Sequence, residues 1–220
     1  MTGENAASRP SLPTFTRDGR LVVVARAQQA ADYDRVIDVL VDAGVRSVEV
    51  TLTTPGTFDR LPALIERYRG AADIGVGTVT ALDQLERVID AGAPYAVTPI
   101  TARALVERAV AAGLPIVPGG LTPTELFASW SLGAAAVKVF PAGQVTPGYV
   151  KDLRGPFPGI SVVPSGGVDL DGARAWLDAG AVAVSVGGPL LGDAFAGGDL
   201  AALRERARQF VAACADGVGG

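Results

Sequence analysis

The stretch that decides the fold is residues 124–140, which read TELFASWSLGAAAVKVF. Residues 124–132 predict a helix, and Gly133 directly after them is the usual left-handed stop for a helix. Residues 136–140 then form a short apolar run of the kind that makes a buried strand. A helix followed at once by a buried strand is the repeating half of a parallel βαβ arrangement.

The same alternation of apolar runs and Ala-rich helical segments extends in both directions along the chain. Its period of about 20–25 residues predicts parallel strands joined by crossover helices. The strands are expected at 21–25, 47–51, 73–76, 95–97, 115–117, 136–140, 161–163 and 182–186. The helices include 33–43, 82–91, 102–112, 124–132 and 173–179.

Two arrangements of eight such strands compete: a doubly wound open sheet and a closed barrel. Short connections and near-continuous apolar strands favour an α/β fold of the single-domain (β/α)8 TIM barrel type. We expect this barrel to span residues 21–213. Residues 1–20 are polar and proline-rich, and we expect them to form a flexible tail; we expect the same of residues 214–220.

Composition excludes several classes of function. The 220 residues include no histidine and one cysteine, Cys214, so Ser-His-Asp and Cys-His catalysis and His- or Cys-ligated zinc are excluded. We also expect neither a metal nor a cofactor, and the missing histidines fit this expectation. A formal net charge of −4 argues against nucleic acid as a partner, and no apolar run is long enough for a membrane. The lone cysteine favours a cytoplasmic setting.

Lys138 lies inside the apolar run 134–140, in a chain whose only other lysine is Lys151. A lysine is rarely buried without a partner, because removing the ammonium group from water is costly. Burial also favours the neutral amine, which is a good nucleophile toward carbonyl groups. A lysine that reaches solvent, or half of a structural ion pair, is the alternative.

Glu49 is the expected counterpart of Lys138. Side chains alternate between the faces of a strand, so Ser47, Glu49 and Thr51 share one face. The second and sixth strands of a barrel lie across from each other, and their inward residues can occupy one layer. The alternative, a buried structural ion pair, costs much desolvation for uncertain stability, so this pairing favours catalysis.

Two glycine-rich segments follow the last two strands, Gly166-Gly167 and Gly187-Gly188. Barrels commonly bind phosphate with backbone N–H groups at these loops, although ordinary turn glycines are the alternative reading. Two further residues lie at strand ends. Arg26 could meet an anion, or be an ordinary surface arginine; Thr78 could contact a ligand, or cap the next helix.

The motifs in order resemble one family, the 2-dehydro-3-deoxy-6-phosphogluconate (KDPG) aldolases with the related 4-hydroxy-2-oxoglutarate and galactonate-type aldolases. The resemblance covers residues 21–210. Its motifs are Val48-Glu49-Val50-Thr51-Leu52, Gly75-Val76-Gly77-Thr78-Val79, Val97-Thr98-Pro99, Val117-Pro118-Gly119, Val137-Lys138-Val139-Phe140-Pro141-Ala142 and Pro164-Ser165-Gly166-Gly167-Val168.

The resemblance implies a homotrimeric class I aldolase that needs no metal and acts on a small keto acid. Lys138 takes the position of the Schiff-base lysine, and Glu49 takes that of the proton-transfer carboxylate. Positions lining the pyruvate site are matched by Thr78, Pro99, Phe140 and Ser165. The family's phosphate site is matched by Gly166, Gly167, Gly187 and Gly188.

Two positions depart from the family pattern. Thr53 stands where an arginine usually helps to hold the anionic groups of the substrate, and Pro189 replaces a serine of the phosphate loop. Proline lacks both an N–H donor and a hydroxyl. The identity of the aldehyde half therefore stays open. Two other classes of function also stay open: a phosphate-binding barrel isomerase or epimerase, and a non-catalytic ligand-binding barrel.

Overall fold

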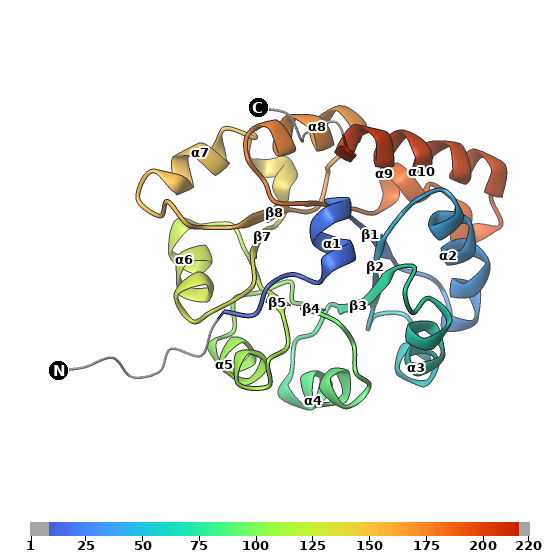
Figure 1. Cartoon of the computed structure of the whole chain (residues 1–220), viewed down its shortest axis with the longest axis horizontal. Coiled ribbons are helices and arrows are strands. Elements are labelled where there is room, and N and C mark those ends of the chain that lie inside the picture. Colours follow the sequence, from blue (N-terminus) through green and yellow to red (C-terminus); the bar gives the residue numbers. More distant parts are fainter. Residues whose placement is uncertain (1–8, 216–220) are drawn as a thin grey trace.

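A computed structural model describes residues 9–215 of the chain. These residues form an α/β fold in which all paired strands are parallel and the helices surround them (Figure 1). The strands are β1 (Leu21–Ala25), β2 (Ser47–Thr51), β3 (Asp73–Gly77), β4 (Ala96–Val97), β5 (Ile116–Val117), β6 (Gly119–Gly120), β7 (Val137–Val139), β8 (Val162–Pro164) and β9 (Val184–Val186).

The α-helices lie around the strands, most of them on the outer face. They are α1 (Thr14–Gly19), α2 (Tyr33–Asp42), α3 (Thr57–Arg67), α4 (Leu82–Asp90), α5 (Arg103–Ala111), α6 (Pro123–Ser131), α7 (Tyr149–Arg154), α8 (Leu170–Asp178), α9 (Gly188–Leu191) and α10 (Leu200–Ala215). Three short 3-10 helices lie at η1 (Ala30–Asp32), η2 (Ala142–Gln144) and η3 (Ala194–Ala196). Among the described residues, no helix has both the length and the apolar character needed to span a membrane.

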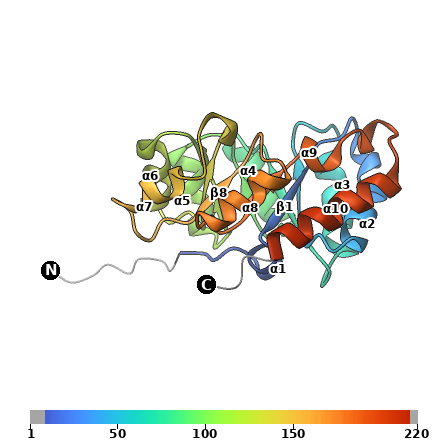
Figure 2. The same cartoon turned by 90° about the horizontal axis from the view of Figure 1, so that it is seen from above.

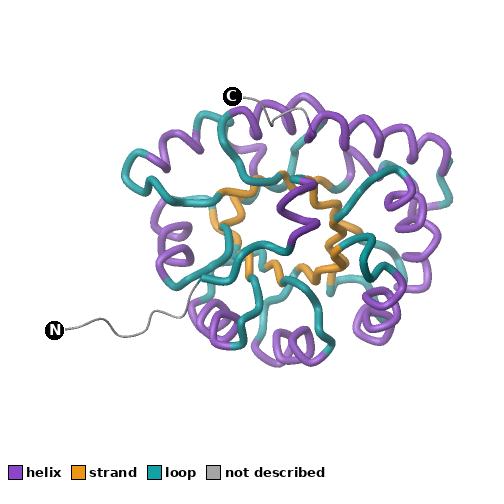
Figure 3. Tube along the Cα trace, viewed as in Figure 1, coloured by secondary structure: helices purple, strands orange, loops and turns teal. Residues whose placement is uncertain are grey.

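The strands form two sheets, whereas the sequence predicted a single barrel of eight strands. One sheet has the order β5-β4-β3-β2-β1-β9 and the other has the order β6-β7-β8. Pro118 separates β5 from β6 because it has no N–H to donate. Figure 3 shows the strands of both sheets around a common interior. The structure thus confirms the parallel α/β arrangement, in two sheets.

Hydrogen bonds cross both junctions between the sheets. Ala135 N donates to Ile116 O at 3.0 Å, and Lys138 N donates to Pro118 O at 2.8 Å. At the other junction, Val182 N donates to Val162 O at 3.0 Å, and a parallel bridge joins Ser165 to Ser185. These contacts keep β7 and β8 in place beside the six-stranded sheet, so side chains from both sheets face one interior.

Helix α1 corrects the prediction of a flexible tail over residues 1–20. It lies across one end of the ring of strands, opposite α9 (Figures 1 and 2). Thr16 is 2% exposed, and its N and Oγ1 donate to Asp73 Oδ2 at 2.7 and 2.9 Å. Six residues with no apolar periodicity cannot predict such a helix, because tertiary contacts hold it in place. Residues 1–8 lie outside the described residues.

The prediction that residues 214–220 are flexible is also corrected, at residues 214 and 215. Helix α10 continues to Ala215, and Cys214 is fully buried. Residues 216–220 lie outside the described residues. The predicted glycine stop at Gly133 is confirmed by its positive φ after α6. Four more glycines adopt positive φ just after a helix: Gly44, Gly92, Gly113 and Gly180.

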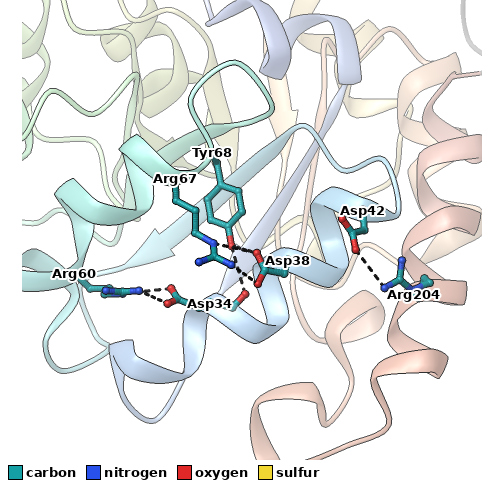
Figure 4. Close-up of polar contacts among 7 residues, drawn as sticks. All are labelled: Asp34, Asp38, Asp42, Arg60, Arg67, Tyr68 and Arg204. Carbon is teal, nitrogen blue, oxygen red and sulfur yellow. Dashed lines mark hydrogen bonds and ion pairs between the residues drawn. The ribbon is translucent and has the colours of Figure 1, made fainter.

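Helix α2 is tied to its neighbours by a surface polar cluster (Figure 4). Arg60 of α3 pairs with Asp34, Arg67 donates to Asp38 at 2.6 Å, and Arg204 of α10 reaches Asp42 at 3.4 Å. Exposed pairs of this kind contribute little each, about 0–1 kcal/mol. They help to hold the helices in position outside the strands. The interior of the fold is lined by other residues.

Candidate active site

A cavity of about 580 Å³ opens at the C-terminal ends of the strands. The structure brings every predicted site residue together in its lining. They are Arg26, Glu49, Thr78, Pro99, Lys138, Phe140, Ser165, Gly166, Gly167, Gly187 and Gly188. This is the end at which parallel barrels carry their active sites.

Lys138 points into this cavity from the middle of β7 and is 7% exposed. Its backbone neighbour in the sheet is Gly119 of β6. Its Nζ lies 5.0 Å from the centre of the Phe140 ring, whose face attracts a cation. A buried amine beside an aromatic wall has the environment expected of a nucleophile toward a carbonyl group.

Glu49 is 2% exposed and enters the same cavity from β2. Its carboxylate occupies the space that a side chain at Gly77 of β3 would fill, since a Cβ atom there would overlap Glu49 Oε1. Within the described residues, Glu49 Oε2 has no hydrogen-bond partner. A buried carboxylate oxygen without a donor is costly, so this atom is ready to accept a proton or a hydrogen bond from a ligand.

Glu49 and Lys138 form no ion pair with each other, although both face the cavity. The alternative reading of a structural ion pair is therefore wrong for this pair. A nucleophile and a proton acceptor therefore line one cavity, which is the arrangement that covalent catalysis with proton transfer needs.

Thr78 lies directly after β3 with φ of 63°. A β-branched residue in this left-handed region is a genuine outlier, and such strain is found most often at functional sites. Its alternative role as a helix cap is excluded, because α4 begins at Leu82 with Ala81 at the N-cap. Thr78 instead lines the cavity.

The four predicted loop glycines form one end of the cavity. Gly166 and Gly167 adopt φ of 86° and 81°, which favours glycine. The backbone N–H groups of Gly167, Gly187 and Gly188 donate to no other group of residues 9–215. Amide groups left in this way can bind an anion. Arg26 is exposed at the same cavity and forms no ion pair within that part of the chain.

The two departures from the family pattern have different surroundings. Thr53 donates to Thr51 Oγ1 at 3.1 Å and lies outside the cavity lining. Pro189 lines the cavity within α9. Sequence reasoning missed other lining residues, which carry no motif. They lie in β1, in the loop after it, and along the segment from α9 to η3: Val24, Ala27, Gln28, Leu191, Gly192, Asp193, Phe195 and Ala196.

Known proteins are similar to this chain in sequence and fold. The chain is 33% identical over 155 residues to the 2-dehydro-3-deoxy-6-phosphogalactonate aldolase of Escherichia coli K12, covering 70% of this chain and 76% of that protein. It is 33% identical over 196 residues to the KHG/KDPG aldolase of the same organism, covering 87% and 89%. A solved structure described as native KDPGal aligns with a TM-score of 0.83 at 31% identity, covering 90% and 95%.

A sequence model described as KDPG and KHG aldolase matches residues 13–205. This range includes both cavity-facing groups, Lys138 and Glu49, and both glycine-rich loops. The chain therefore belongs to the KDPG and KHG aldolase family of lyases.

Proposed function

We propose that this protein is a class I aldolase that reversibly cleaves a 2-keto-3-deoxy-(phospho)sugar acid such as KDPG. The products are pyruvate and an aldehyde, which is glyceraldehyde 3-phosphate for KDPG. One observation carries the proposal: a nearly buried lysine and a nearly buried carboxylate face one cavity without pairing with each other.

The reaction begins at Lys138. Its neutral amine attacks the C2 carbonyl carbon, and the carbinolamine loses water to give a protonated imine. Glu49 takes the proton of the C4 hydroxyl, the C3–C4 bond breaks, and its electron pair moves into the imine to form an enamine. The aldehyde leaves. Protonation of C3 and hydrolysis then release pyruvate and regenerate the amine. Phe140 limits water around these charged steps.

The far end of the substrate is anionic in this proposal. The glycine N–H groups and Arg26 supply donors and one positive charge there. The galactonate epimer of KDPG is a second candidate, since a relative and a solved structure that bear its name match this chain and Thr53 replaces the usual arginine. The smaller 4-hydroxy-2-oxoglutarate is a third, from the KHG relatives.

Three further properties belong to the proposal. We infer that the two sheets act as one (β/α)8 barrel, because hydrogen bonds cross both junctions. We infer a homotrimer, whose contacts would cover apolar groups such as Leu82 and Ile100, each 46% exposed. A cytoplasmic location is consistent with a single, buried cysteine.

Borohydride trapping with pyruvate, followed by peptide mass mapping, tests the mechanism. We expect a reduced adduct on Lys138, none in Lys138→Met, and an unchanged adduct in Lys151→Met, which alters an exposed lysine of α7. A folded protein without any adduct would exclude the imine and favour an isomerase or a ligand-binding barrel. Pyruvate release from KDPG, its galactonate epimer and 4-hydroxy-2-oxoglutarate then ranks the substrates.

A further inference from the structure

The loop that brings Arg26 to the cavity is held from behind by one buried hydroxyl group. Strand β1 ends at Ala25, and Arg26 and Gln28 then line the cavity on either side of Ala27. The Ala27 N–H donates to Thr54 Oγ1 at 3.1 Å, and the Thr54 hydroxyl donates to Ala27 O at 3.2 Å. Both polar groups of the Ala27 backbone are thus bound by a single side chain.

Thr54 makes these hydrogen bonds from outside the cavity lining. It is 1% exposed, so water does not reach its hydroxyl group to replace them. The next residue adds a second attachment, because Ala30 N donates to Pro55 O at 3.0 Å. Residues 54–55 therefore hold the loop 26–30 at two points, on the side away from the cavity.

The segment around Thr54 is held in place by hydrogen bonds of its own. Thr54 N donates to Thr51 O at 3.1 Å, and the buried Thr57 hydroxyl donates to Thr54 O at 2.8 Å. The Ala27 carbonyl can only accept, so it uses the single Thr54 hydroxyl proton. Thr51 Oγ1, 3.4 Å away, must then donate to Thr54, and it accepts from Thr53 at 3.1 Å. Three hydroxyl groups thus form one chain that ends at Ala27.

Arg26 depends on this support because little else holds it. The residue is exposed, and within residues 9–215 its side chain forms no ion pair. Binding an anion costs conformational entropy in a loop and in its side chains, and a loop that is already fixed has less to lose. The hydrogen bonds to Ala27 therefore bear on how well the neighbouring arginine can bind.

We propose that Thr54 is a positioning residue for Arg26, which it holds at the cavity so that the guanidinium group binds the anionic far end of the keto acid. The inference rests on the proposed aldolase function and deepens it. Thr54 touches neither the substrate nor the reacting atoms. Its loss should therefore weaken substrate binding and leave the chemistry at Lys138 intact, whereas a merely structural role would lower stability alone.

A double-mutant cycle tests whether Thr54 acts through Arg26. Thr54→Val keeps the shape of the side chain without the hydroxyl, and Arg26→Met removes the charge. For whichever of the three proposed keto acids is cleaved fastest, we expect KM to rise about fivefold in Thr54→Val and about tenfold in Arg26→Met, the order expected for hydrogen bonds to a charged group. We expect kcat to stay within about twofold, because uniform binding is lost. The double variant should stay near tenfold, since independent effects would multiply to about fiftyfold.

Two further variants separate positioning from general damage to packing. Thr54→Ser restores the hydroxyl and should return KM to within about twofold of the unaltered protein. Thr16→Val is the matched control, because it also removes a buried hydroxyl, at the closed end of the fold. It should lower stability without raising KM. If Thr54→Val does not fold, Thr54→Cys takes its place in the cycle, since a thiol is a weaker donor on a similar side chain.

Four results would overturn the inference. They are an unchanged KM in Arg26→Met or in the Thr54 variant of the cycle, effects of the two positions that multiply, a KM that Thr54→Ser does not restore, and an equal rise of KM in Thr16→Val. Borohydride trapping of pyruvate on Lys138 should persist in every variant. Absence of trapping in the unaltered protein would instead contradict the proposed function, so the two failures are distinguishable.

Discussion

At the scale of single residues, the site depends on which positions have no side chain. Glu49 and Tyr95 fit only because Gly77 and Gly75 lack a Cβ atom. The segment Gly75-Val76-Gly77 thus has a packing role in the structure. Small residues can therefore determine where catalytic groups point without touching a substrate.

Gly77→Ala should lower turnover by about 100-fold, the lower range of what a positioned acid or base contributes. The new methyl group would displace the Glu49 carboxylate, while Lys138 stays in place. We therefore expect trapping of pyruvate to persist and aldol cleavage to fall. Gly148→Ala is the matched control, because Gly148 is exposed with φ of −54° and a nearest neighbour at 3.5 Å. Equal activity of the two variants would contradict the prediction.

Thr78→Gly should stabilise the protein while reducing its activity. Holding a non-glycine residue in left-handed geometry costs about 1–3 kcal/mol, whereas the added chain entropy of glycine costs about 0.4–1 kcal/mol. The first effect is the larger at φ of 63°. Urea unfolding should show a higher midpoint, and pyruvate release should slow because the hydroxyl at the cavity is lost. A lower midpoint would show that Thr78 is not strained.

Cys214 should resist thiol reagents in the native protein at neutral and mildly alkaline pH. Burial raises the pKa of its thiol to about 11, so the reactive thiolate is scarce and inaccessible. Labelling should become rapid once urea unfolds the chain. Rapid labelling of the native protein would mean that the end of α10 opens readily.

At the scale of secondary-structure elements, helix ends show most clearly that neighbouring residues in the sequence can determine the structure. Helix α6 begins with a capping box, in which Thr122 accepts from Glu125 N and the Glu125 side chain accepts from Thr122 N. Helix α1 shows the opposite case. Its Asp73 and Ser47 contacts come from β3 and β2, far along the chain.

Thr122→Ala should lower the free energy of unfolding by about 1 kcal/mol, the usual cost of losing such a cap. Thr124→Ala, at an exposed position of the same helix, should stay within about 0.5 kcal/mol. Hydrogen bonds from Thr122 lower the pKa of Glu125, so this contribution is present at neutral pH and is lost as pH falls through the folded value. Urea unfolding at neutral and acidic pH measures both effects; equal losses in the two variants would contradict them.

At the scale of the whole molecule, the site exists because strands distant in sequence face one interior. Glu49 comes from the six-stranded sheet and Lys138 from the three-stranded sheet. Neither sheet alone contains both groups. The contacts at Pro118 and Ser165 that join the sheets therefore matter for activity as well as for stability.

Light scattering should report a particle of about three times the 22.3 kDa mass of one chain. Ile100→Asp should shift the population toward monomer, since a charge at an apolar contact leaves water at a cost. Gln28→Asp, which adds the same charge at an exposed position of the cavity, is the control. A monomeric unaltered protein would contradict the homotrimer.

Local patterns predicted much of this protein because they follow from local physics. β1 and β2 begin and end where apolar alternation places them, and glycine stops end five of the helices. The predicted site residues meet in one cavity, since strand direction and alternation determine which side chains share an end of the fold.

Other features could not be predicted, because their causes are contacts between distant segments. The sequence by itself determined the parallel α/β architecture and the residues that face its interior, through periodicity and glycine geometry. Only the tertiary structure decided that α1 covers the closed end, that Glu49 and Lys138 stay unpaired, and that the buried Tyr95 hydroxyl is hydrogen-bonded to Ser47. These depend on the packing of buried polar groups, each of which needs a partner that no local pattern specifies.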